Sequence, residues 1–181
     1  MSKDLREFLK EMVSIVVIAF ILAMILRTFI IEGRIIPSGS MLPTLQLQDR
    51  VMVNKFIYYF KEPQRGDIAV FDPPEVLNSK DQFIKRVIGL PGETVEVKEG
   101  KVYINGKALV EPYVTEAPNY EFGPVVVPEG CLFMLGDNRN RSFDSHLWNA
   151  WLTRDRVIGK AFIIYWPIKD ITDLKREVSF E

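Results

Sequence analysis

A long apolar segment near the N-terminus constrains this chain more than any other feature. Residues 12–31 read MVSIVVIAFILAMILRTFII, interrupted only by Ser14, Arg27 and Thr28. Twenty helical residues span roughly 30 Å, the thickness of the hydrocarbon core of a bilayer. Arg27 lies near one end of the segment, where its long side chain can reach the membrane interface. The segment therefore predicts a transmembrane anchor.

Two other structures are compatible with an apolar segment of this length. A cleaved signal peptide would need a small-x-small site after its core, and the residues that follow do not provide one. A buried core helix is the other possibility, although this segment is apolar around its whole circumference, which also suits a helix surrounded by lipid. We expect an uncleaved, single-pass anchor with the N-terminus in the cytoplasm and the rest of the chain outside, although the charges flanking the segment favour this orientation only weakly.

This anchor divides the chain into four parts. Residues 1–11 are expected to form a short cytoplasmic tail, and residues 12–31 the anchor. Residues 32–168 should form an extracytoplasmic domain, followed by a charged and peripheral tail at residues 169–181.

The counts of cysteine and histidine exclude several kinds of site. Cys131 is the single cysteine of the chain, so an intrachain disulfide cannot form. His146 is the single histidine, and zinc sites usually need several His or Cys ligands. A Ser-His-Asp or Cys-His site would have to use His146. The net charge of −1 gives no electrostatic basis for binding nucleic acid.

Short strand-like segments with turn residues between them make up most of the chain after the anchor. The expected strands are residues 50–53, 67–71, 83–90, 94–97, 101–104, 107–110, 130–135 and 157–166. Asn105-Gly106 is a strong signal for a two-residue hairpin. Residues 111–128 are expected to be a long loop or small excursion. The pattern predicts a mainly β domain built from a folded antiparallel sheet or barrel.

The first of three candidate chemical segments follows the anchor. Residues 36–45 read IPSGSMLPTL, with Ser38 and Ser40 on either side of a glycine and prolines beyond them. A constrained turn of this kind can expose a hydroxyl and direct backbone N–H groups at an oxyanion. Taken alone, the segment is equally compatible with a surface linker.

The second candidate segment, residues 83–93, places two cations inside an apolar strand. Neighbouring residues of a strand point to opposite faces, so Lys85 or Arg86 should be directed inward and the other solvated. A buried lysine can lose its proton and act as a general base, which an arginine cannot do. Lys85 is therefore the functional candidate. The alternative is an edge strand with both cations in water.

The third candidate segment, residues 136–146, reads GDNRNRSFDSH and directly follows an apolar run. So many polar groups at the end of a buried strand indicate a hydrogen-bonded loop, although a solvated loop has the same composition.

Taken in order, the three segments resemble the motifs of the type I signal peptidase family, the bacterial leader peptidases. The resemblance also covers the anchor and residues 154–161, and therefore extends over nearly the whole chain. One N-terminal span and a short middle excursion are similar to the compact form found in Gram-positive bacteria. The resemblance implies a Ser-Lys peptidase on the outer face of a membrane that uses no cofactor.

The resemblance assigns roles to residues in each motif. It implies that Ser40 is the nucleophile and Lys85 the general base. Ser38 would help to stabilise the oxyanion through its hydroxyl, beside the N–H of Ser40. Ser142 would orient the lysine, and Asp144 corresponds to an aspartate of the family.

One residue departs from the family pattern. His146 stands where the family commonly has an arginine that pairs with the aspartate. Arg139, Arg141 or His146 itself could pair with Asp144, and we expect His146 to be structural rather than the base.

By the same resemblance, the partners are preproteins cut after a small-x-small site, reached from the lipid bilayer. We expect Ile35, Ile36, Met41 and Ile84 to line shallow substrate pockets, and neither metal nor nucleic acid to bind. Two other functions share some of these features. One is a self-cleaving Ser-Lys protein similar to the repressors of the SOS response, and the other is an inactive membrane-anchored β module that binds secretion partners.

Overall fold

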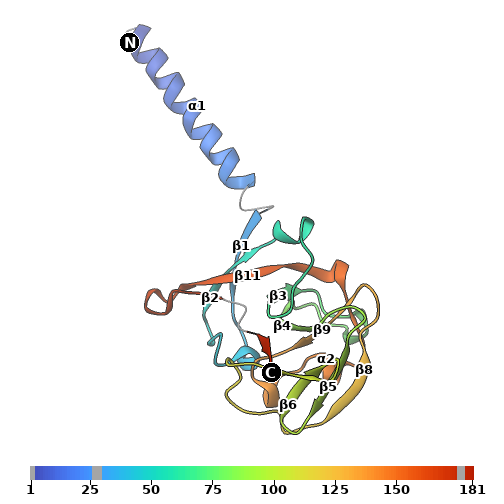
Figure 1. Cartoon of the computed structure of the whole chain (residues 1–181). Helices are drawn as coiled ribbons and strands as arrows, with labels where there is room; N and C mark the ends of the chain where they lie inside the picture. Colours follow the sequence, from blue (N-terminus) through green and yellow to red (C-terminus); the bar gives the residue numbers. More distant parts are fainter. Residues whose placement is uncertain (1–2, 26–29, 175–177) are drawn as a thin grey trace.

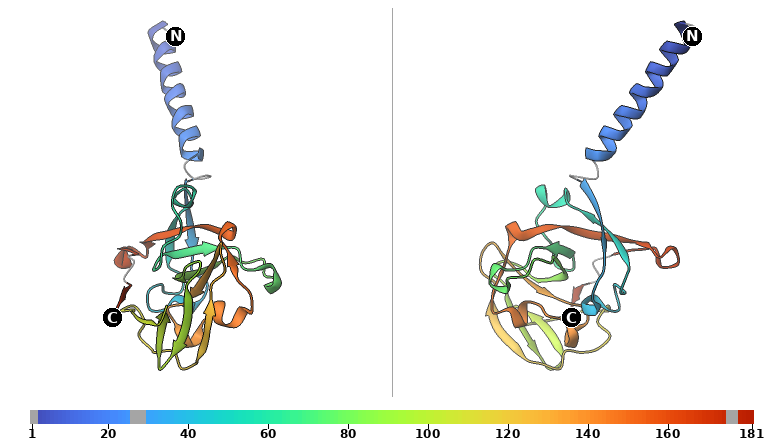
Figure 2. Two further views of the ribbon diagram at one scale, coloured as in Figure 1. Left: turned by 45° about the vertical axis from the view of Figure 1, so that its right-hand side comes forward. Right: turned by 180° about the vertical axis from the view of Figure 1, so that it is seen from behind.

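Antiparallel β-structure makes up the part of the chain that follows helix α1 (Lys3–Ile25), as Figure 1 shows. The computed structural model describes residues 3–25, 30–174 and 178–181. The strands form two sheets that curl around each other, and both views of Figure 2 show α1 projecting away from them. The expectation of a mainly antiparallel β domain with a folded sheet is confirmed.

The larger sheet has the strand order β1-β2-β11-β3-β4-β9-β10, and β12 pairs with β11. Its strands are β1 (Ile31–Ile35), β2 (Arg50–Asn54), β3 (Ile68–Phe71), β4 (Phe83–Gly89), β9 (Cys131–Leu135), β10 (Leu152–Thr153), β11 (Val157–Trp166) and β12 (Thr172–Asp173). The smaller sheet has the order β13-β7-β6-β5-β8, formed by β5 (Thr94–Lys98), β6 (Lys101–Ile104), β7 (Lys107–Val110), β8 (Phe122–Val126) and β13 (Ser179–Phe180).

Short helical turns connect these strands. They are α2 (Ser145–Trp148) and the 3-10 turns η2 (Gly39–Met41), η3 (Ile57–Tyr59), η4 (Glu75–Leu77), η5 (Arg139–Arg141), η6 (Arg154–Arg156) and η7 (Ile168–Asp170). The Asn105-Gly106 hairpin joins β6 to β7 as predicted, with positive φ angles of 50° and 78° at the two turn residues.

Three boundaries differ from those predicted. Residues 111–128 are not entirely loop, because β8 forms the edge of the smaller sheet there. Its Gly123-Pro124 pair is compatible with an edge strand and conceals the strand pattern. The C-terminal tail contributes β12 and β13, which pair with β11 and β7. Ile31, expected at the end of the anchor, begins β1.

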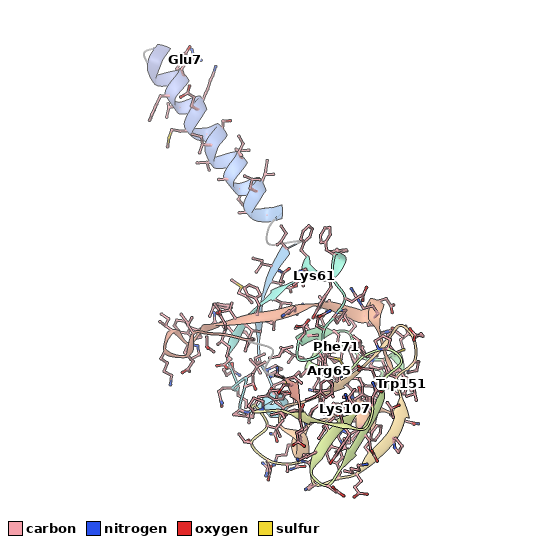
Figure 3. All side chains as sticks on the ribbon, viewed as in Figure 1. Glu7, Lys61, Arg65, Phe71, Lys107 and Trp151 are labelled. Atoms are coloured by element: carbon pink, nitrogen blue, oxygen red, sulfur yellow. The ribbon has the colours of Figure 1, made fainter. Side chains whose placement is uncertain are left out.

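Helix α1 carries apolar side chains on all sides, and those described are exposed, including Val13, Val17 and Ile21. Figure 3 shows the side chains drawn on α1 projecting from the helix, which stands clear of the sheets. Within the described residues, no helix combines the length and hydropathy that a membrane crossing requires. Residues 26–29 of the expected anchor lie outside the described part of the chain.

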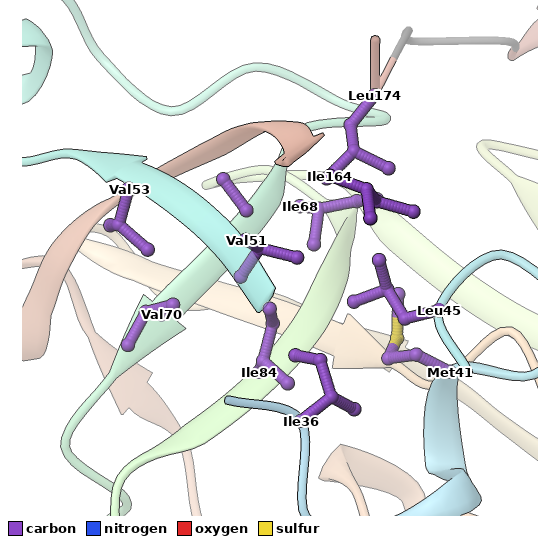
Figure 4. Packing of buried hydrophobic residues seen from close by; sticks show 11 residues of the cluster. Ile36, Met41, Leu45, Val51, Val53, Ile68, Val70, Ile84, Ile164 and Leu174 are labelled. Carbon is purple, nitrogen blue, oxygen red and sulfur yellow. The ribbon is translucent and has the colours of Figure 1, made fainter. Parts of the chain in front are cut away.

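Strand β4 lies between layers and is buried on both of its faces. Ile84 packs into a core cluster with Met41, Val51 and Ile68 (Figure 4). Ile88 packs on the smaller sheet, and Val87 belongs to a third cluster with Trp148. Because both faces are covered, a charged residue of this strand must find its partner inside the protein.

Arg86 of β4 finds that partner in Asp137, directly after β9. The Nε and Nη2 atoms of Arg86 donate to the two carboxylate oxygens of Asp137 at 2.9 and 2.6 Å, and Nη1 donates to the Gly66 carbonyl at 2.9 Å. Both side chains of the pair are 2% exposed or less. Thr44 Oγ1 also donates to Asp137, at 2.5 Å. The pair therefore connects β4 to two of the candidate chemical segments, residues 36–45 through Thr44 and residues 136–146 through Asp137.

Breaking this pair should destabilise the protein strongly. We expect Arg86→Met to lower the free energy of unfolding by about 3–5 kcal/mol, because it leaves the buried Asp137 carboxylate without its cation. The double variant Arg86→Met/Asp137→Leu should lose less than the sum of the Arg86→Met and Asp137→Leu losses. Urea unfolding, monitored by circular dichroism, measures the free energy of unfolding of the two single variants and the double variant. Losses that add up would contradict an energetic coupling between Arg86 and Asp137.

Candidate active site

The turn that carries Ser40 is held by the core on one side. Residues 39–41 form η2, in which Met41 is fully buried and Ser40 is 8% exposed. The side chain of Met41 packs in the cluster of Figure 4 together with Leu45. This anchoring fixes the turn, so that the Ser40 hydroxyl is held in a defined direction.

Lys85 approaches Ser40 from β4. Its Nζ lies 2.6 Å from Ser40 Oγ, and the ring centroid of Phe83 lies 5.7 Å from the same Nζ. Burial lowers the pKa of Lys85 to about 8, although the Asp144 and Asp137 carboxylates raise it in opposition. The amine is therefore within hydrogen-bond reach of a hydroxyl and loses its proton at a much lower pH than an ordinary lysine.

Arg86 is buried as deeply as Lys85, which corrects the expectation that one of the two cations is solvated. Lys85 is 5% exposed and Arg86 is 1% exposed. The two side chains do point to opposite faces of β4, but each of these faces is covered by another layer of the domain. The strand pattern could not reveal the second layer.

Residues 136–144 brace the turn of Ser40 through the backbone. Asn138 N–H donates to the Ser40 carbonyl at 3.1 Å, and its Nδ2 donates to the Gly39 carbonyl at 3.0 Å. Gly136 lies so close that a Cβ there would be 2.4 Å from the Ser40 carbonyl oxygen. Sequence reasoning did not single out Asn138, whose only signal was its place in a polar loop.

The structure pairs Asp144 with His146. Asp144 is fully buried, and its Oδ1 lies 2.5 Å from His146 Nδ1. Its Oδ2 accepts from Gly136 N–H at 2.9 Å. Arg139, the alternative partner, instead donates to Glu111 at 2.7 and 2.8 Å.

The two remaining serines lie beside these groups. Ser38 Oγ is 3.5 Å from Ser40 Oγ, on the same turn. Ser142 is buried, and a Cβ on Gly136 would lie 2.2 Å from its Oγ. Among the described residues the Ser142 hydroxyl makes no hydrogen bond, so the expected contact with Lys85 is not formed in this structure.

A cleft of about 580 Å³ opens onto Ser40 and Lys85. Its walls are formed by Pro37, Ser38, Gly39, Ser40, Leu42, Asp81, Gln82, Phe83, Ile84, Lys85, Asn138, Arg141 and Phe143. Of the four residues expected to line substrate pockets, Ile84 lies in this wall. Ile36 and Met41 do not, because their side chains are packed in the core, and Ile35 is exposed outside the cleft.

Sequence reasoning missed Phe143 as a wall of the cleft. It is 51% exposed between the buried residues Ser142 and Asp144. An apolar residue within an otherwise polar loop was the available signal.

No cluster of three or more His, Cys, Asp or Glu side chains that could hold a metal ion occurs in the part of the chain that the structure describes. The chemical groups gathered in the cleft are a serine hydroxyl, a lysine amine of lowered pKa and a second serine hydroxyl. This arrangement can perform nucleophilic catalysis with an amine as base.

Comparison with known proteins identifies the family. The profile of the family described as signal peptidase, peptidase S26 matches residues 9–166. The chain is 49% identical to "Probable signal peptidase I-2" of Synechocystis sp., over 87% of this chain and 73% of that protein. It is 47% identical to "Signal peptidase I" of Leptolyngbya laminosa (95% and 87%) and 38% identical to that of Bacillus licheniformis (94% and 95%). The chain therefore belongs to the signal peptidase family, peptidase S26.

Proposed function

We propose that this chain is a serine endopeptidase that removes N-terminal signal peptides from preproteins, with Ser40 as nucleophile and Lys85 as general base. The relatives named signal peptidase I support the reaction. The contact that carries the residue assignment is the 2.6 Å distance between Lys85 Nζ and Ser40 Oγ, inside a cleft.

The first chemical step transfers a proton to Lys85. A neutral Lys85 amine accepts the proton of Ser40 Oγ while this oxygen attacks the carbonyl carbon of the scissile peptide. The tetrahedral intermediate collapses when the leaving amine takes the proton from the Lys85 ammonium, which leaves an ester on Ser40. Lys85 then accepts a proton from a water molecule that attacks the ester carbon. As the bond between this carbon and Ser40 Oγ breaks, Lys85 returns the proton to Oγ, which restores the hydroxyl and releases the carboxylic acid product.

The oxyanion of the intermediate needs hydrogen-bond donors at a fixed position. The Ser40 N–H and the Ser38 hydroxyl are proposed for this role, because both belong to the turn that presents the nucleophile. Ser38 Oγ lies 3.5 Å from Ser40 Oγ. It is therefore near enough to reach the oxyanion, which is bound to the same carbonyl carbon that Ser40 Oγ attacks. Ser142 is proposed to orient the protonated Lys85, since its buried hydroxyl has no partner among the described residues.

The substrates are proposed to carry small side chains before the cut, in a small-x-small pattern. The cleft beside Ser40 has apolar walls formed by Pro37, Leu42, Phe83 and Ile84. Such walls favour apolar side chains, and the resemblance to signal peptidases supports small ones.

The apolar segment that begins at residue 12 and makes up most of α1 is proposed to anchor the enzyme in the membrane, with its N-terminus in the cytoplasm and the β domain on the outer face. The exposed apolar side chains of α1 support this, since a solvated helix rarely exposes such a surface. An anchored enzyme and a membrane-inserted signal peptide share one surface, which raises their effective concentration.

Removing either member of the pair should abolish cleavage. We expect Ser40→Ala and Lys85→Ala to lower kcat by several powers of ten, as for other nucleophile–base pairs. Lys85→Arg should be equally inactive, because an arginine stays charged and cannot act as base. The assay incubates the full chain with a purified preprotein in detergent and identifies the new N-terminus by mass spectrometry.

Cys131→Ala is the matched control, and it should cleave at the wild-type rate because the buried thiol lies outside the cleft. The same assay separates the alternative functions. Cleavage of the chain itself but of no preprotein would indicate a self-cleaving protein, and a stable complex without cleavage would indicate a binding module. Either result, or full activity in Ser40→Ala, would overturn the proposal.

Charges in the middle of α1 should prevent anchoring. An arginine at the centre of a membrane helix costs about 2.5–3.5 kcal/mol, so Val17→Arg/Ile21→Arg should reduce insertion. Chains synthesised in the presence of phosphatidylcholine vesicles are floated on a density gradient. Wild type and the control Glu7→Gln should float with the vesicles, and the double variant should stay at the bottom. Wild-type chains that remain at the bottom would contradict an anchor.

A further inference from the structure

The imidazole of His146 is held on three sides. Its Nδ1 contacts Asp144 Oδ1 at 2.5 Å, and because an ionised carboxylate only accepts, Nδ1–H is the donor. The ring stacks on Tyr120, with centroids 4.1 Å apart and planes 5° from parallel. Phe122 meets it edge-on at 6.4 Å. The side chain is therefore fixed by a hydrogen bond and by two aromatic rings from the smaller sheet and its connecting loop.

The hydrogen bond of His146 continues through Asp144 to Gly136, which packs against the backbone of Ser40. The other carboxylate oxygen, Oδ2, accepts from Gly136 N–H at 2.9 Å. Gly136 in turn lies against the backbone of Ser40, with room for no side chain between them. A rotation of the Asp144 carboxylate would release Gly136, and the backbone that presents Ser40 would lose one of its supports beside Asn138.

Asp144 also affects Lys85 through its charge. Burial lowers the pKa of Lys85, and of the two carboxylates that oppose this lowering Asp144 has the larger effect. Of the other charged groups nearby, Asp137 is paired with Arg86 and Glu111 with Arg139, while Arg141 is exposed in the wall of the cleft. The hydroxyl of Tyr120 stays protonated, because burial raises its pKa. The charge beside Asp144 therefore depends on the residue at position 146.

We propose that His146 is a positioning residue of this peptidase, which acts through Asp144 and Gly136 on the placement of Ser40 and on the charge that Lys85 experiences. Its ring fills the place between Tyr120 and Asp144, and its Nδ1–H orients the carboxylate. This inference rests on the proposed function, because it assigns Ser40 and Lys85 the roles given above.

Three substitutions separate the hydrogen bond, the ring and the charge. His146→Phe keeps an aromatic ring on Tyr120 but removes the donor to Asp144. His146→Asn keeps a neutral donor near the position of Nδ1. His146→Arg adds a fixed positive charge beside the carboxylate. Leu147→Gln is the control, because Leu147 lies on the same helix and is 56% exposed.

The hydrogen bond should matter for turnover more than for substrate affinity. We expect His146→Phe to lower kcat about 10–100-fold, the loss typical of a misplaced reacting group, with KM changed by less than about threefold. His146→Asn should recover most of the lost kcat, and Leu147→Gln should equal the wild type. Thermal unfolding of each variant verifies that it is folded.

The charge of residue 146 beside Asp144 should affect the pH dependence of kcat/KM. A purely structural role of this residue would not alter that dependence. A fixed cation offsets the negative charge of Asp144, so the acid limb of His146→Arg should lie at lower pH than that of His146→Asn. This comparison stands even where His146→Phe fails to fold. Superimposed profiles of the two variants, or a His146→Phe kcat within twofold of the wild type, would overturn the inference. A wild-type enzyme that cleaves no preprotein would instead overturn the proposed function.

Discussion

The amine of Lys85 lies 2.6 Å from the hydroxyl of Ser40, in a position from which most water is excluded. An ammonium group loses much of its solvation there, and this loss favours the neutral amine that a general base requires. Bringing a lysine into such a place needs a strand covered on both faces. β4 is that strand, since the clusters around Ile84, Val87 and Ile88 enclose it. The two curled sheets would therefore serve the proposed chemistry of Lys85 as well as the stability of the domain.

Two buried carboxylates near Lys85 act against its neutral form, and the structure compensates for both. Asp137 is bound in a two-pronged ion pair by Arg86, the neighbour of Lys85 on β4. Asp144 is bound by Gly136 N–H and by His146. These same bonds fix residues 136–144 against the turn of Ser40. One loop thus affects both the position of Ser40, the proposed nucleophile, and the electrostatic environment of Lys85, the proposed base.

Much of this architecture could be predicted from the sequence, and each failure has a physical cause. The strands from β2 to β7 are short apolar or alternating runs between turn residues, which are local signals. The burial of Arg86 could not be predicted, because a strand pattern does not show whether a second layer covers the other face. The edge strand β8 was concealed by Gly123-Pro124.

In the candidate site, too, the motifs could be found in the sequence, whereas the contacts between them depend on the fold. Ser40 and Lys85 are 45 residues apart and were paired through the resemblance of their motifs, whereas their contact is a property of the fold. The partner of Asp144 was left open among Arg139, Arg141 and His146, since the choice depends on where Glu111 lies. Met41 was expected to line a substrate pocket, but in η2 its side chain turns into the core.

The protonation of Lys85 is the quantity on which the mechanism depends most directly, and NMR can measure it in the full chain in detergent. The ¹³Cε resonance of Lys85, assigned by its loss in Lys85→Arg, is followed as the pH is raised. A buried base should titrate with a midpoint near 8. A midpoint near 10.5, the ordinary value for lysine, would show a solvated ammonium at neutral pH and would contradict Lys85 as the general base.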